Sequence, residues 1–224
     1  REIVRRDSMV EIDGTQIMSK RVFVASGHLE SFVDPIITCK ACKTTLRADR
    51  LIAEKTGRSV PERLAEEEFD QLILQYGIRC PDCKGEFDHV RRFNMMFKVG
   101  IGPSGEEAYL RPETCQSIFV DFPRLFKVMR CKMPIGFAQF GKSFRNEISP
   151  RQSLIRLREF YQAEVEVFFN PKRVEEFERF DEVKDYELRI CIDEEKVKPV
   201  SCAGAVQKGL VHHRLIAYYL AILQ

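Results

Sequence analysis

The 224-residue sequence predicts an α+β fold that is interrupted by a small metal-binding module. Two long segments, 137–147 and 157–169, alternate polar and apolar residues with the period of two that is typical of strands in a sheet. Apolar residues between 118 and 129 recur at helical spacing, so we expect a helix that packs against a core. Two Cys-x-x-Cys pairs precede these segments and define the module.

Composition and charge narrow the class of protein. With 44% hydrophobic and 31% charged residues, the composition excludes disordered, collagen-like and coiled-coil proteins. No apolar run approaches the ~20 residues of a membrane span. The net charge is only +2, so any affinity for nucleic acid must come from local patches. Because the sequence starts without Met and stops inside the apolar stretch 215–223, we expect a piece of a longer protein.

The elements on either side of the module are short. Residues 10–13 predict a strand that ends at Gly14, and segment 23–28 leads into a loop. After the module, residues 93–99 predict a strand, and a glycine-rich turn follows at 100–105.

The two cysteine pairs are typical of a structural zinc site. Cys39 and Cys42 form one pair, and Cys80 and Cys83 form the other. Two residues between ligands let both sulfurs of a pair reach one ion at about 2.3 Å, and two pairs complete a tetrahedral site. Sulfur at all four positions leaves no place for a reacting water, so such a zinc ion would be structural. Two disulfides, or four reduced core cysteines, are the alternatives.

The rest of the module predicts a small helix. Ser59 and Glu62 fit a capping box that would start it. Apolar residues near helical spacing follow: Leu64, Leu72, Ile73 and Tyr76. Lys84 and Gly85 suit a tight turn with positive φ. The cysteines outside the module lack metal-ligand spacing and are expected to be buried neutral thiols: Cys115, Cys131, Cys191 and Cys202.

Polar groups gather on one face of the two predicted strands. In the first strand they are Gln139, Ser143, Arg145 and Glu147, with Gly141 leaving room between them. In the second strand this face holds Arg158, Phe160, Gln162, Glu164 and Glu166, and the other face holds Tyr161, Ala163, Val165, Val167 and Phe169. One interpretation is a half-solvated sheet with cross-strand ion pairs. The other is a ligand site whose cationic end binds an anion and whose carboxylate end binds an ammonium group.

These segments resemble motif 2 of the class II aminoacyl-tRNA synthetases, in the form found in archaeal and eukaryotic glycyl-tRNA synthetases. The matching residues are 144–147, 148–151, 156–160 and 163–164. Other segments that look like this family are the two cysteine pairs, 26–28, 47–52, 93–97, 110–114 and, similar to the end of motif 1, 9–13. The resemblance covers about residues 7–224.

The resemblance implies part of the class II antiparallel sheet with flanking helices and a zinc-binding insertion. Its four regions would be the start of the catalytic core with the end of motif 1 (1–37), the zinc-binding insertion (38–88), the core with motif 2 (89–170), and a truncated helical segment or start of an insertion (171–224). The sequence departs from the family at Cys115 and Ser117, where alanine and glycine are usual. Ser19 stands near the place of the motif 1 proline, and motif 3 is not in the sequence.

In function, the resemblance implies a cytoplasmic glycine–tRNA ligase. Such an enzyme makes glycyl adenylate from glycine and ATP with Mg²⁺ and transfers glycine to tRNA(Gly); it would be a homodimer with structural Zn²⁺ and no membrane partner. One alternative is a truncated synthetase-like protein that binds nucleotide, tRNA or a protein partner without aminoacylation. Another is a zinc-knuckle nucleic-acid module, which the basic residues Lys40, Lys43, Arg47 and Arg50 favour and the acidic run 66–68 opposes.

The residues implied for ATP lie in motif 2. Arg145 would hold the α-phosphate and stabilise the charge of the transition state, which a planar guanidinium suits. Glu147 would accept a hydrogen bond from the adenine amino group, and Phe160 would stack on the base. The remaining implied ATP-binding residues are Asn146, Arg156 and Leu157.

The residues implied for glycine carry both signs of charge. Glu113 and Glu164 match carboxylates that hold the ammonium group, and Arg47 could face the carboxylate. Each has an alternative: Glu113 could complement a helix dipole, Glu164 could pair with a cross-strand arginine, and Arg47 could be a surface charge. His28 is expected to form a hydrogen bond within its loop.

Overall fold

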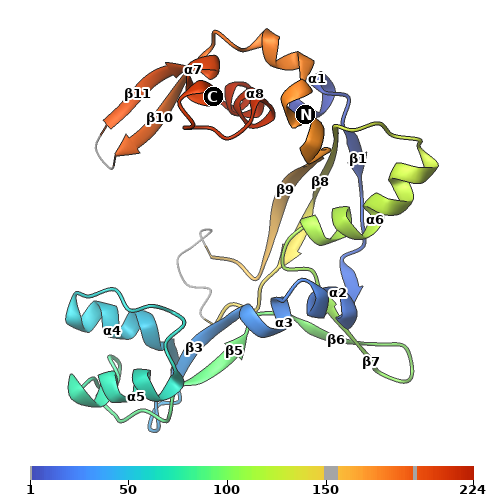
Figure 1. Cartoon of the computed structure of the whole chain (residues 1–224). Coiled ribbons are helices and arrows are strands. Elements are labelled where there is room, and N and C mark those ends of the chain that lie inside the picture. The colour runs from blue at the N-terminus through green and yellow to red at the C-terminus, as the bar shows by residue number, and fades with distance from the viewer. Residues whose placement is uncertain (1, 149–155, 194–195) are drawn as a thin grey trace. The chain divides into compact units, whose positions relative to one another are not determined.

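The computed structural model describes residues 2–148, 156–193 and 196–224 (Figure 1). The chain forms two compact units. The terminal unit, which contains both ends of the chain, comprises Arg1–Ile12, Phe122–Ala138 and Val165–Gln224. The central unit comprises Asp13–Asp121 and Gln139–Glu164.

The central unit contains two small antiparallel sheets, with strand orders β2-β7-β6 and β4-β3-β5. Its elements are β2 (Ile17–Ser19), α2 (Lys20–Ala25), α3 (His28–Ser31), β3 (Val33–Thr38), β4 (Thr45–Arg47), α4 (Ala48–Thr56), α5 (Glu66–Gln75), β5 (Arg91–Asn94), β6 (Lys98–Ile101) and β7 (Glu106–Leu110). Helix α4 packs against β3 and α5 and closes a separate hydrophobic core around Ile52 and Phe69 (Figure 1).

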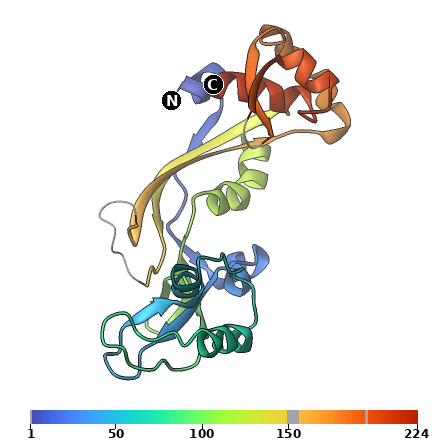
Figure 2. The same ribbon diagram turned by 90° about the vertical axis from the view of Figure 1, so that its left-hand side faces the viewer.

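The terminal unit combines short helices with a pair of antiparallel strands. Its elements are α1 (Glu2–Arg6), β1 (Val10–Ile12), the 3₁₀ helices η2 (Pro171–Glu176) and η3 (Glu178–Glu182), β10 (Glu187–Asp193), β11 (Lys196–Ser201), α7 (Cys202–Gln207) and α8 (Arg214–Leu223). Strands β10 and β11 pair antiparallel, and α7 and α8 pack beside them (Figure 2). Leu188, Cys202 and Tyr218 are fully buried in this core. The segment expected to be helical after residue 170 therefore also contains a strand pair.

Three elements run through both units: α6 (Cys115–Val128), β8 (Ile135–Phe144) and β9 (Glu159–Phe168). They confirm the helix predicted for 118–129 and the two long strands, although both strands are shorter than expected. Strand β8 lies between β1 and β9 in a three-stranded sheet. Among the described helices, none combines the length and apolar character that crossing a membrane requires.

The single strand expected at 93–99 is divided in two. Strand β5 ends at Asn94, and β6 begins at Lys98. The Asn94 side chain accepts a hydrogen bond from the Met96 amide at 2.8 Å and donates one to the Leu29 carbonyl at 2.9 Å. Such an Asx turn competes with strand pairing, and here it breaks the strand.

The capping box expected at Ser59 and Glu62 is wrong. Helix α5 starts at Glu66, where the carboxylate of Glu68 accepts a hydrogen bond from the Ala65 amide at 2.8 Å. Glu62 is instead an ion-pair partner of Arg47 at 2.6 Å. A tertiary partner therefore replaces the local one that the sequence pattern predicted.

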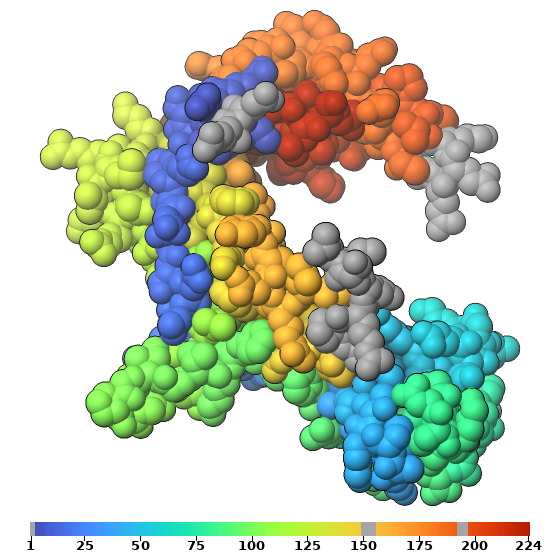
Figure 3. All heavy atoms as spheres, turned by 180° about the vertical axis from the view of Figure 1, so that it is seen from behind, coloured from blue at the N-terminus to red at the C-terminus, as the bar shows by residue number. Residues whose placement is uncertain are grey.

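The alternation of polar and apolar residues predicted for β8 and β9 is confirmed. The interpretation that the polar face is half-solvated is wrong for β8. Gln139 and Ser143 on this face are 1% and 0% exposed, whereas Tyr161 on the apolar face of β9 is 64% exposed. Tyr161 stacks on Phe140, with ring centres 5.3 Å apart and an interplanar angle of 7°. Atoms of β9, in gold, lie uncovered at the surface in Figure 3.

Candidate functional site

The four cysteines of the module converge on one point. The sulfurs of Cys39 and Cys83 are 3.5 Å apart, those of Cys42 and Cys80 are 3.6 Å apart, and all four lie within 4.8 Å of one another. Sulfurs at about 2.3 Å from a central ion would be about 3.8 Å apart in a regular tetrahedron, so small shifts suffice to admit a metal. Cys39, Cys42, Cys80 and Cys83 are not joined in disulfides, which contradicts the alternative of two disulfides.

The backbone around these thiols forms two similar turns. Lys43 and Lys84 adopt φ values of 62° and 63°, which confirms the tight turn expected at Lys84. Gly85 is needed for space, because a Cβ there would lie 3.2 Å from the sulfurs of Cys39 and Cys83. Each turn therefore presents its sulfurs on a backbone that is already shaped around them.

The exposed thiols of the two pairs differ in acidity. Hydrogen bonds with the side chain and backbone of Thr44 lower the pKa of Cys42 to about 6. For Cys83, the backbone N–H of Gly85 acts to lower the pKa, but contacts with neighbouring thiols such as Cys39 outweigh it and raise the pKa to about 11. One thiol is thus ready to bind a cation as thiolate, and a metal would have to displace the protons of the others.

The prediction for the cysteines outside the module holds in one case. Cys202 is fully buried, and burial raises the pKa of its thiol. Cys191 on β10 is exposed, and Cys115 and Cys131 are half-buried, so a buried thiol is wrong for these three. Cys191 lies in a two-stranded sheet, which cannot cover both of its faces, and Cys115 contacts Glu113 at 3.2 Å.

Arg145 lies between two aromatic rings just after the end of β8. Its Cζ atom is 5.5 Å from the ring centre of Phe32 and 5.3 Å from that of Phe160. Its Nε donates a hydrogen bond to the Pro112 carbonyl at 3.3 Å. Within the described ranges, the guanidinium forms no ion pair, so most of its donors remain available for an anion such as phosphate.

The other predicted ATP-binding residues lie around Arg145. Glu147 is 16% exposed at its side chain and faces Arg156, whose Nε is 3.9 Å from its carboxylate. The backbone N–H of Asn146 donates to the Met95 carbonyl at 2.8 Å, and this anchors the start of the motif 2 loop to the turn after β5. Leu157 is exposed. Residues 149–155, which include part of the segment that resembles motif 2, lie outside the described residues.

Glu113 and Glu164 come together, as the resemblance implied. One carboxylate oxygen of each lies within 4.8 Å of the other and of the Cys115 sulfur. Oε1 of Glu113 accepts hydrogen bonds from Gln116 Nε2 at 2.5 Å and from the Cys115 thiol at 3.2 Å. Thr114 Oγ1 and Gln162 Nε2 donate to the two oxygens of Glu164.

The charge of Glu113 is maintained in this setting. Burial acts to raise its pKa, but the hydrogen bonds from Cys115 and Gln116 and the positive charges of His28 and Arg145 outweigh burial and lower the pKa below its usual value. The alternative of a helix-dipole partner is compatible with its place before α6. Both carboxylates nevertheless face each other, which suits a cation between them.

Arg47 has a different environment from the other predicted residues. Its guanidinium contacts Asp34 at 3.0 Å, Asp49 at 2.7 Å and Glu62 at 2.6 Å. Burial acts to lower its pKa, but these carboxylates raise it overall. Burial raises the pKa of Asp34, and the nearby negative charge of Glu147 also raises it. Arg47 is therefore a half-buried residue with three ion-pair partners, not the exposed charge of the alternative interpretation.

The sequence reasoning missed Arg111, whose side chain is 0% exposed. Its Nε donates to the Lys142 carbonyl and its Nη1 to the Gly14 carbonyl, both at 2.9 Å. A Cβ at position 141 would lie 2.4 Å from Nη2, so Gly141 makes the room that Arg111 occupies. The absence of a side chain at 141 was the signal that could have located this residue.

Comparisons with known proteins agree with this geometry. A model of the tRNA synthetase class II core domain (G, H, P, S and T) matches residues 97–207. The glycine–tRNA ligases of Thermococcus kodakarensis and Pyrococcus furiosus are 46% and 48% identical to this chain over 230 residues. That of Methanocaldococcus jannaschii is 44% identical over 232 residues. The first two matches cover 100% and the third 99% of this chain, and each covers 40% of the relative.

The chain belongs to the class II aminoacyl-tRNA synthetases. Within that class, it is similar to the archaeal glycine–tRNA ligases along its whole length. It spans about 40% of the length of these relatives.

Proposed function

We propose that the protein is a glycine–tRNA ligase, which activates glycine with ATP and transfers it to tRNA(Gly). The main support for this proposal is the environment of the Arg145 guanidinium. Its guanidinium is held between Phe32 and Phe160 and has no ion-pair partner among the described residues, while the two carboxylates of Glu113 and Glu164 face each other nearby. A free guanidinium beside paired carboxylates matches a substrate pair of one phosphate and one ammonium.

In the activation step, an oxygen of the glycine carboxylate attacks the α-phosphorus of ATP, and pyrophosphate leaves with the electron pair of the broken P–O bond. No general base is needed, because the nucleophile is already an anion. Arg145 stabilises the negative charge that grows on the phosphoryl oxygens. Mg²⁺ would be held mainly by the nucleotide and would neutralise part of the charge of its phosphates.

Neighbouring residues would hold the adenine. Glu147 accepts from the amino group, and Phe160 stacks on the base after its ring turns from the guanidinium. Arg156, now facing Glu147 at 3.9 Å, reaches the bent phosphates. Asn146 and Leu157 complete the wall of this pocket.

Glu113 and Glu164 would hold the glycine ammonium, and the space around them would reject larger amino acids by steric exclusion. Arg47 contributes by holding Asp34 and the module in place, and it reaches the glycine carboxylate only if it releases one of its three acids. We further propose a homodimer in the cytoplasm, with the four regions divided at residues 37, 88 and 170.

The module fits a structural zinc ion. Four thiols without a disulfide, two of them buried, are a donor set that Zn²⁺ prefers, and they leave no position for substrate. Freshly purified protein should contain about one zinc per chain. Cys80→Ser should lose it, while Cys191→Ser, which changes an exposed cysteine outside the module, should keep it. A zinc content far below one per chain in unmodified protein would refute the site.

The test of the function is glycine-dependent exchange of pyrophosphate into ATP by the full-length protein. Arg145→Ala should abolish the exchange, and Arg124→Ala, at an exposed position of α6, should leave it unchanged. Equal exchange with alanine or serine would contradict the glycine assignment. Binding of ATP without any exchange would favour the synthetase-like protein that does not aminoacylate.

A further inference from the structure

His28, which we expected only to form a hydrogen bond within its loop, connects that loop to the paired carboxylates. Its Nδ1 is 2.9 Å from the hydroxyl of Ser26, and its Nε2 is 3.2 Å from Oε1 of Glu113. The side chains of His28 and Glu113 are 17% and 27% exposed, so the contact is partly shielded from solvent.

The imidazole is held on several sides. Gly27 adopts a φ of 77° between α2 and α3, and this reversal brings Ser26 and His28 together. The ring of His28 packs edge-on against Phe23 and Phe32, at centre distances of 6.2 and 5.6 Å. The Asn94 side chain, from β5, also donates to the His28 carbonyl at 3.3 Å. The position of Nε2 is therefore set by the fold.

The two oxygens of Glu113 are used unequally. Oε1 accepts hydrogen bonds from Cys115 and Gln116 and is also the oxygen that lies 3.2 Å from Nε2 of His28. In the part of the chain that the structure describes, no hydrogen bond or ion pair ends on Oε2. Two hydrogen bonds and the imidazole contact on one oxygen fix the carboxylate plane and leave the other oxygen for a ligand.

We infer that His28 is a positioning residue: by binding Oε1 it turns Oε2 of Glu113 toward the ammonium group of the amino-acid substrate. This inference rests on the proposed function. Nε2 can carry a hydrogen toward Glu113 in either protonation state of the ring, because Ser26 can donate to a bare Nδ1 or accept from a protonated one. His28 acts through Glu113 and touches no reacting atom, so its loss should weaken glycine binding and leave ATP binding and turnover intact.

The experiment compares two replacements in the full-length protein. A glutamine amide nitrogen occupies roughly the place of Nε2, so His28→Gln keeps the donor to Glu113. An asparagine amide reaches only the place of Nδ1, so His28→Asn loses that donor and keeps the contact with Ser26. The readouts are the KM for glycine, the KM for ATP and kcat in the exchange reaction, with His89→Asn, at a histidine whose side chain is 96% exposed, as the matched control.

We expect His28→Asn to raise the KM for glycine about tenfold, the size of a lost polar contact with a charged group, with kcat and the KM for ATP within about twofold. His28→Gln should restore most of the glycine affinity, and His89→Asn should change nothing. An unchanged KM for glycine in His28→Asn, or equal losses in kcat and both KM values, would overturn this inference while the proposed function stands. No glycine-dependent exchange by the unmodified protein would overturn both.

Discussion

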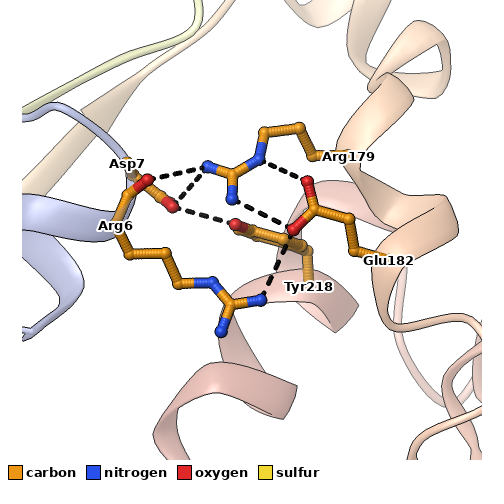
Figure 4. A network of polar contacts seen from close by, with 5 residues as sticks. All are labelled: Arg6, Asp7, Arg179, Glu182 and Tyr218. Atoms are coloured by element: carbon orange, nitrogen blue, oxygen red, sulfur yellow. Dashed lines mark hydrogen bonds and ion pairs between the residues drawn. The ribbon is translucent and has the colours of Figure 1, made fainter.

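Two arginines that each face aromatic rings show how the two units use charge. In the terminal unit, Arg179 contacts the ring of Tyr218 and binds both Asp7 and Glu182, while Arg6 binds Glu182 from the other side (Figure 4). In the central unit, Arg145 contacts two rings and, among the residues described, has no acidic partner within ion-pair distance. Saturated charges fix parts of a chain to one another, whereas an open charge is available to a ligand.

The hydrogen bonds of Asp7 show what a paired charge contributes to the structure. Tyr218 donates to Oδ1 of Asp7 at 2.8 Å, and Arg179 donates to the same carboxylate. These bonds join Asp7, which follows α1, to η3 and α8, and these segments lie far apart in the sequence (Figure 4). We therefore expect substitutions here to change stability, and substitutions around Arg145 to change activity.

The largest contrast should come from replacing each arginine by lysine. Arg145→Lys loses the planar fork that matches a phosphate, so exchange should fall by about 100-fold or more while the melting temperature is retained. Arg179→Lys should retain the rate of exchange and lower the melting temperature. Steady-state exchange and thermal unfolding of both variants test this, and a reversed pattern would contradict the comparison.

Gly141→Ala should be the next largest effect. The new Cβ would meet Nη2 of Arg111 at 2.4 Å, and Arg111 is too buried to move aside. We expect a loss of about 1–3 kcal/mol in the free energy of unfolding, the usual result of overpacking, measured by urea denaturation. Gly209→Ala is not a suitable control because φ is 67° there, so Gly100→Ala serves as one, since it is exposed and its new Cβ would lie 3.6 Å from the nearest atom. Wild-type stability in Gly141→Ala would show that Arg111 can shift.

Removing Arg179 altogether should have a smaller effect. Its side chain is 35% exposed, so water screens part of the interaction and replaces part of what is lost. We expect Arg179→Met to lower the free energy of unfolding by about 1–2 kcal/mol, because Asp7 is left buried without its cation. Asp7→Asn with Arg179→Met should be less destabilised than the sum of the two changes, which a double-mutant cycle would measure.

The smallest effect concerns pH. The hydrogen bond and charge of Arg179 lower the pKa of Glu182 below its usual value. The stability from this carboxylate is thus present at neutral pH and is lost as the pH falls through its lowered value in the folded protein. The melting temperature of Glu182→Gln should fall less than that of the unmodified protein between neutral pH and pH below about 4. If the melting temperatures of the two proteins fell equally with pH, Glu182 would not contribute to the stability of this network.

Much of this fold follows from local patterns. The spacing of Cys39, Cys42, Cys80 and Cys83 predicted their convergence, because two short turns restrict where the sulfurs can lie. The alternation in β8 and β9 predicted strands, and the resemblance predicted that Glu113 and Glu164 would meet. The metal itself and the roles of the site residues stay predictions.

The errors arose where a distant residue replaces a local partner. Glu62 binds Arg47 and so does not cap a helix, and Asn94 binds the carbonyl of Leu29 and breaks a strand. The burial of Arg111 could not be read from its neighbours in sequence, because its acceptors come from Gly14 and Lys142. Periodicity reports which residues share a face, and it does not report what covers that face.

The position of Phe160 has an optical consequence. The sequence contains no tryptophan, so Phe160→Trp would introduce the only indole of this chain. Without a ligand, the indole would lie against the Arg145 guanidinium, and its fluorescence emission would report contact with a cation. The emission would change when the ring turned to stack on a nucleotide base. Phe32 would support the guanidinium throughout, so the signal would time the arrival of adenine separately from the chemistry that follows.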